Sequence, residues 1–162
     1  MVHPTGFDPV FSDLAVRAAR ALEDGDAKTA EELYREMVRK YPNNCISHEN
    51  LGVCLYFQKR LIEARECFLK ALEVNSRSER AHRCLGANDH AQGRLDEAIK
   101  NLTRANEIQE HGLSHWCLAL IHDQKGESDE ALTHFECALQ SGQISDSARR
   151  HAEERIKLLT KE

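Results

Sequence analysis

Cysteine and histidine are the residue types in this chain that could carry chemistry, with six cysteines and nine histidines among 162 residues. The cysteines are widely spread, and no two form the Cys-x-x-Cys pair typical of zinc and redox motifs. The six are Cys45, Cys54, Cys67, Cys84, Cys117 and Cys137. The first residues show no basic region followed by an apolar stretch. We therefore expect no secretory signal, reduced thiols and a cytoplasmic protein.

A zinc site is the first chemistry to consider, around His111, His115, Cys117 and His122. On a single helix His111 and His115 would share a face, because they are four residues apart. His111, however, falls in a predicted loop between helices, and the spacing of the set matches no zinc signature. We expect no metal and no cofactor.

The charge and motif content of the chain argue against several other functions. Lys and Arg number 22 and Asp and Glu 27, so the net charge is −5, which is atypical of proteins that bind nucleic acid or anionic membranes. No apolar run approaches the roughly 18 residues that span a bilayer. Dinucleotide-binding, P-loop, nucleophile-elbow and zincin motifs are absent from the sequence. We expect no enzyme, no nucleic-acid ligand and no membrane insertion.

An internal repeat positions all of these residues. Alanines recur about every 34 residues, a period typical of repeated structural units. They are Ala30, Ala64, Ala98 and Ala131. A large side chain follows each alanine by four positions, and these are Tyr34, Phe68, Leu102 and Phe135. Turn glycines recur as well, with Lys59 in the place of one of them. Spacings of three and four within each unit predict amphipathic helices.

This pattern resembles the tetratricopeptide repeat family, in which Leu-Gly, Ala and aromatic positions recur about every 34 residues. Leu51-Gly52, Leu85-Gly86 and Leu118-Ala119 fill the first of these positions. The resemblance implies an all-α fold, a right-handed superhelical solenoid of antiparallel helix pairs. Four units are expected at 11–44, 45–78, 79–111 and 112–145, after an irregular lead-in at 1–10 and before a capping helix at 146–162. The family's tyrosine position departs from the pattern and reads Ala21, Leu55, Asp89 and His122.

The register of the family also implies which side chains line a concave, peptide-binding groove. They are Glu49, Asn50, Val53, Tyr56, Phe57, Arg80, Arg83, Cys84, Ala87, His90, Trp116 and Leu120. Aromatic residues with Arg nearby are the types that dominate binding energy at interfaces. Alternatively, Tyr56 and Trp116 pack between helices, and Arg80 and Arg83 are simply solvated.

A subset of the family binds the acidic tail of cytosolic chaperones with a two-carboxylate clamp. The equivalent positions here are Ala15, Ala19, Asn50, Arg80 and Cys84, of which only Asn50 and Arg80 fit. We therefore predict that this chain does not bind those tails.

Three hypotheses of function follow. The leading one is a non-catalytic scaffold that binds a protein or peptide ligand in the groove. The second is a small dedicated chaperone, similar to the class II chaperones of type III secretion. The third is a self-assembling scaffold that forms homo-oligomers. Cys84 and Cys117 occupy matching positions of adjacent units, which suggests either a redox pair or a shared preference for small residues.

Overall fold

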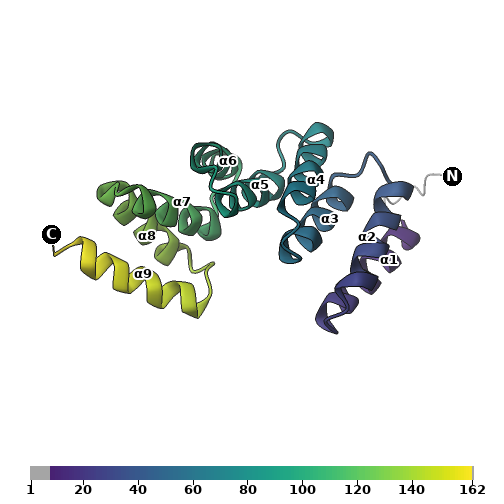
Figure 1. Ribbon diagram of the computed structural model, residues 1–162, viewed down its shortest axis with the longest axis horizontal. Helices are drawn as coiled ribbons and strands as arrows, with labels where there is room; N and C mark the ends of the chain where they lie inside the picture. Colours follow the sequence, from purple (N-terminus) through teal and green to yellow (C-terminus); the bar gives the residue numbers. More distant parts are fainter. Residues whose placement is uncertain (1–7, 162) are drawn as a thin grey trace. The chain divides into compact units, whose positions relative to one another are not determined.

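The computed structural model describes residues 8–161, which fold into nine α-helices and contain no strand (Figure 1). The helices are α1 (Pro9–Glu23), α2 (Ala27–Lys40), α3 (Cys45–Phe57), α4 (Leu61–Val74), α5 (Glu79–Ala91), α6 (Leu95–Ile108), α7 (Gly112–Lys125), α8 (Ser128–Ser141) and α9 (Asp146–Leu159). The predicted all-α class is confirmed. Among the described residues no helix is both long and apolar enough to cross a membrane.

The first helix begins at Pro9, earlier than the start near residue 11 that the sequence predicts. Asp8 explains the difference, because its Oδ1 accepts a hydrogen bond from the Val10 amide at 2.9 Å and caps the helix. Pro9 fits the first turn, where no backbone donor is needed. Phe7 and the rest of residues 1–7 lie outside the described part of the chain.

The chain divides into two compact units, Met1–Ser76 and Arg77–Glu162. In the first unit α1 packs on α2, α2 on α3, and α3 on α4. In the second unit α5 packs on α6, α6 on α7, α7 on α8, and α8 on α9. The main contacts join neighbours in sequence, as expected of stacked repeats, and α5 also touches α7.

The recurring alanines form the closest contacts within the helix pairs. Ala30, Ala64, Ala98 and Ala131 are each fully buried. A glycine of the facing helix packs even more closely. A Cβ added at Gly52 of α3 would lie 2.6 Å from the Phe68 ring of α4. The atoms nearest to this added Cβ belong to Phe68, one helical turn after Ala64. Such close packing explains why small residues recur at these positions.

A left-handed residue closes the turn within each helix pair. Gly25, Gly93 and Gly126 have φ near +75°, and Lys59 has φ of 64° at the equivalent point of the second pair. A non-glycine residue in this conformation costs roughly 1 kcal/mol. The alignment of Lys59 with the turn glycines therefore reflects a shared backbone conformation.

Two departures at the family's tyrosine position make polar contacts across the turn that follows them. Asp89 is fully buried, and its Oδ1 accepts from Arg94 Nη2 at 2.8 Å. His122, the equivalent residue of the next pair, lies 2.5 Å from Glu127 through Nδ1. Both pairs tie the end of the first helix to the start of the second, so they stabilise the turn between them.

Candidate peptide-binding surface

One face of α3 carries a row of side chains that the core of its unit leaves partly or largely accessible. Ile46, Asn50, Val53 and Phe57 follow at steps of four, three and four, which place them on one helical face. We call these four residues the α3 stripe. Its ends are open, with Ile46 49% and Phe57 72% exposed, whereas Asn50 and Val53 are half-buried. The stripe is thus an apolar surface with one amide near its middle.

Two neighbours of the stripe support it from the sides. Tyr56 is half-buried, and its ring meets the Phe57 ring edge-to-face with centroids 5.6 Å apart. Glu49 is buried, and its Oε1 accepts a hydrogen bond from Cys45 Sγ at 3.2 Å. Glu49 therefore contributes to the order of α3 and presents little charge at the surface.

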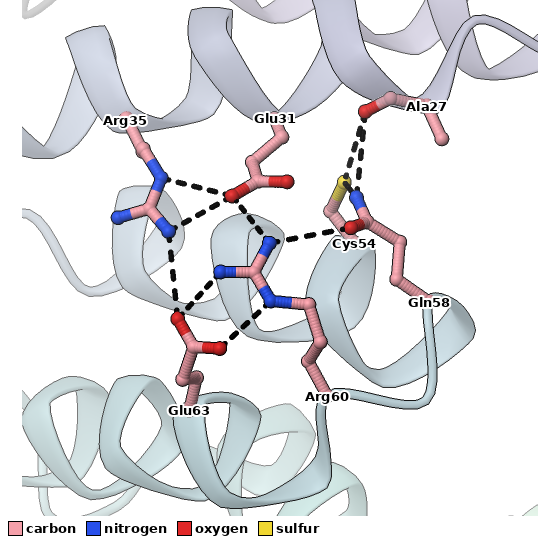
Figure 2. Close-up of polar contacts among 7 residues, drawn as sticks. All are labelled: Ala27, Glu31, Arg35, Cys54, Gln58, Arg60 and Glu63. Atoms are coloured by element: carbon pink, nitrogen blue, oxygen red, sulfur yellow. Dashed lines mark hydrogen bonds and ion pairs between the residues drawn. The ribbon is translucent and has the colours of Figure 1, made fainter.

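A polar network fixes the stripe-bearing helix to the preceding pair (Figure 2). Glu31 of α2 accepts hydrogen bonds from Arg35 Nη2 at 2.8 Å and from Arg60 Nη1 at 2.6 Å. Arg60 lies in the turn between α3 and α4 and also donates to Glu63, through Nε at 2.7 Å. Gln58 Nε2 reaches the Ala27 carbonyl at 3.4 Å. The turn that follows Phe57 is therefore bonded to both α2 and α4.

The charges of this network reinforce one another. Burial of Glu31 opposes its ionisation, but hydrogen bonds from Arg60 and Arg35 outweigh that effect and lower its pKa. The hydrogen bond from Arg60 likewise lowers the pKa of Glu63. Both carboxylates are therefore ionised at neutral pH, as a four-residue ion-pair network requires.

In the second unit, α5 carries the predicted residues Arg80, Arg83, Cys84, Ala87 and His90 along one side. All five are half-buried. Arg83 Nε donates to Glu79 Oε1 at 2.7 Å, and His90 Nε2 lies 3.4 Å from Gln124 Oε1 of α7. The face of α5 is thus more polar than the α3 stripe, and Arg83 already has a carboxylate partner within its own helix.

The Cys117 thiol next to this face is in its neutral form at neutral pH. Burial raises the pKa of Cys117 to about 11, and the nearby Arg83 lowers it only in part. Burial and the charge of Arg83 together lower the pKa of His111. A thiol reacts through its thiolate, so Cys117 is a weak nucleophile at neutral pH. No disulfide joins any of the six cysteines, all of which lie within residues 8–161, and within that range no group of three or more His, Cys, Asp or Glu is placed to hold a metal.

Known proteins that are similar to this chain support its organisation into repeated helix pairs. A family model described as tetratricopeptide repeat matches residues 45–78. The chain is 33% identical over 93 residues to tetratricopeptide repeat-containing protein trd-1 of Caenorhabditis elegans, which covers 57% of this chain and 11% of that protein. The crystal structure of MamA superimposes with a TM-score of 0.76 at 22% identity, covering 89% of this chain and 82% of MamA. Residues 45–78 are thus a tetratricopeptide repeat, and the described part of the chain has the fold of tetratricopeptide repeat solenoids.

A further structural relative carries a bound peptide. The first tetratricopeptide repeat domain of Spaghetti, in complex with an HSP90 peptide, superimposes with a TM-score of 0.68 at 20% identity. The match covers 72% of this chain and 93% of that one. By contrast, this chain spans only 11% to 20% of the length of the curated relatives it matches.

Trp116 and Leu120, which the repeat register assigns to the groove, pack against the end of the repeat array. Both lie on the buried cluster that Phe135 of α8 and Ala152 of α9 help to form. The Trp116 ring is 5.8 Å from that of Phe135 and 5.4 Å from that of His151. Trp116 is half-buried, so it combines this packing with an accessible edge.

The sequence reasoning missed two features of these surfaces. Ile46 begins the α3 stripe, and it was identifiable because it lies four residues before Asn50 on a predicted helix. The network of Glu31, Arg35, Arg60 and Glu63 carried no comparable signal. Glu31 and Arg60 are 29 residues apart, and only the stacking of α2 against the α3–α4 turn brings them together.

Proposed function

We propose that this protein is a non-catalytic interaction module that binds an extended peptide or a partner helix along the first helices of its repeats. The observation that carries the proposal is the α3 stripe, which exposes Ile46 and Phe57 on a helix whose other faces are buried. Burying a large apolar side chain contributes about 1.5–3 kcal/mol, so Phe57 is the expected anchor. The six free thiols fit a cytoplasmic setting.

The predicted groove residues divide into three roles in this proposal. Val53, Tyr56 and Phe57 supply apolar contact, and Asn50 supplies an amide for the backbone of the ligand. Arg80, Arg83 and His90 supply polar contacts in the second unit, with the small residues Cys84 and Ala87 between them. Glu49, Trp116 and Leu120 keep the helices of their own units in place.

The chemistry of the ligand follows from these side chains. The Spaghetti domain, a structural relative, is bound to an HSP90 peptide, which supports a peptide as the ligand class here. The two-carboxylate clamp is matched only at Asn50 and Arg80. We therefore propose a ligand with a large apolar side chain for the α3 stripe, and no binding of acidic chaperone tails.

Site-specific photo-crosslinking of the full chain tests the proposal. A benzophenone amino acid is placed at position 57 in one variant and at position 69 of α4 in the other, because Leu69 is 37% exposed and lies outside the stripe. Each variant is exposed to the same displayed peptide library. Enrichment of apolar peptides at position 57 alone is the expected result. Equal crosslinking at both positions, self-crosslinking alone, or none at position 57 would contradict it.

A further inference from the structure

Three histidines form a contact chain between α7 and α8. His115 and His122 lie seven residues apart on α7, and His134 of α8 sits against both. His115 Nδ1 is 3.0 Å from His134 Nδ1, and the His134 ring stacks on that of His122 with centroids 5.4 Å apart. We call these three residues the histidine stack.

A carboxylate closes each end of the histidine stack. Glu110 Oε1 lies 3.1 Å from His115 Nε2, and Glu127 Oε2 lies 2.5 Å from His122 Nδ1. Asn106 Nδ2 is also within 3.4 Å of His115 Nε2. His115 and His122 each face a carboxylate, whereas no carboxylate of residues 8–161 is hydrogen-bonded to His134 in the middle.

The number of protons on the two Nδ1 atoms decides whether the His115–His134 hydrogen bond can form. Two Nδ1 atoms that face each other at 3.0 Å share one proton, because one nitrogen must donate while the other accepts. If both nitrogens carry a proton, the hydrogen bond is lost and two cations stand against each other. The pair therefore holds at most one excess proton without opening.

Both acidic groups and histidines surround His134. Glu130 of its own helix exerts a weak attraction on a protonated His134. Glu107 of α6 and Glu110 of the segment between α6 and α7 line a hollow of about 330 Å³ that also reaches His115 and His134. His115 and His122 of α7 oppose a proton on His134. None of these carboxylates is hydrogen-bonded to His134 within the described residues. A proton on His134 therefore gains no carboxylate partner that would compensate its charge.

We propose that the histidine stack is an acid-sensitive latch, in which protonation of His134 places a half-buried cation between His115 and His122 and loosens α8 from α7. The inference does not depend on the proposed binding function. Burial, and then the neighbouring His115 and His122, lower the pKa of His134 from 6.5 to about 4. The folded pKa lies below the unfolded one, so this group's contribution is present above pH 6.5 and is lost as the pH falls towards 4.

Native-state hydrogen exchange of the full chain tests the latch. The measured quantity is the opening equilibrium of α7 and α8 amides, corrected for intrinsic exchange rates, between pH 7.5 and pH 5. In the wild type we expect opening to increase by up to about 30-fold over this range, from the two pKa values of His134. Amides of α2 and α3 in the first unit provide the internal reference, since they lie outside the latch.

Two variants separate the latch from general acid sensitivity. His134→Gln retains a polar side chain that does not titrate, so its opening equilibrium should be nearly independent of pH, whatever its stability at pH 7.5. His90→Gln removes another half-buried histidine of the same unit and should keep the wild-type pH dependence.

A second readout uses Trp116, the only tryptophan of the chain, which contacts Phe135 of α8. Its fluorescence is compared with and without His151→Gln, because a second histidine, His151, lies against the same ring. Equal pH dependence in the wild type and His134→Gln would overturn the proposal. So would added Zn²⁺ that protects α7 and α8 in the wild type alone, because it would assign the histidine pair to metal binding.

Discussion

The ion-pair network of the first unit yields a quantitative prediction for Glu31→Gln. Glu31 receives three charge-assisted contacts from two arginines, at 3.0, 2.8 and 2.6 Å, and its side chain is only 16% exposed. Exposed pairs contribute about 0.2–1 kcal/mol, and hydrogen bonds to charged groups contribute about 1.5–3 kcal/mol. The arginines are themselves half-exposed and keep Glu63, so the lower end of the second range applies. We expect the free energy of unfolding to fall by about 1.5 kcal/mol.

Urea unfolding of the full chain at pH 7 measures this loss, and hydrogen exchange locates it in α2, α3 and α4. Glu36→Gln is the matched control, because Glu36 forms one exposed pair with Lys40 at 2.8 Å on the same helix. The control should lose clearly less stability than Glu31→Gln. Equal losses in the two variants would refute the reasoning that the network joins two helix pairs.

The same network predicts how the difference depends on pH. The pKa of Glu31 is lowered in the folded state, so its contribution is present above the unfolded pKa and is lost as the pH falls through the folded value. The difference in the free energy of unfolding between the wild type and Glu31→Gln should therefore become smaller as the pH falls. High salt should narrow it as well, because the arginines are accessible to counterions.

Three further substitutions test the packing of the repeats. Lys59→Gly should raise the free energy of unfolding by about 1 kcal/mol in thermal or urea unfolding, because Lys59 adopts φ of 64°; no gain would contradict the left-handed turn. Gly86→Ala should lower it by about 1–3 kcal/mol, since the added Cβ would lie 2.6 Å from Leu102 Cγ; a neutral effect would show that the pair separates freely. Trp116→Ala should lower it by about 2–3 kcal/mol and remove the exchange protection of α9, because the ring contacts Phe135 and His151; retained protection would place the role of Trp116 outside this packing.

Much of the fold could be predicted because a repeated sequence repeats its packing environment. The four regularly spaced alanines are all fully buried, and Lys59 shares the backbone conformation of the glycines with which it aligns. Each of these positions is decided by neighbours within its own helix pair. Local spacing is therefore enough to identify them.

The surfaces were less predictable, because they depend on contacts between distant segments. The groove register does not show that Glu49 is buried while Phe57 is open, since packing against other helices decides their exposure. His115 and His134 are 19 residues apart on different helices, so no spacing rule pairs them. Trp116 has a position in the repeat pattern, yet its neighbours include the last helix, which lies outside that pattern.

The most direct test of the proposed function compares the affinity of one crosslinked peptide for three forms of the full chain. Isothermal titration calorimetry is done with the wild type, Phe57→Ala and Ile62→Ala. Phe57 and Ile62 are equally exposed at 72%, but Ile62 lies on α4 and outside the α3 stripe. We predict that Phe57→Ala weakens binding by about tenfold or more and that Ile62→Ala leaves it unchanged. Unchanged affinity in Phe57→Ala, or equal losses in both variants, would contradict binding along the α3 stripe.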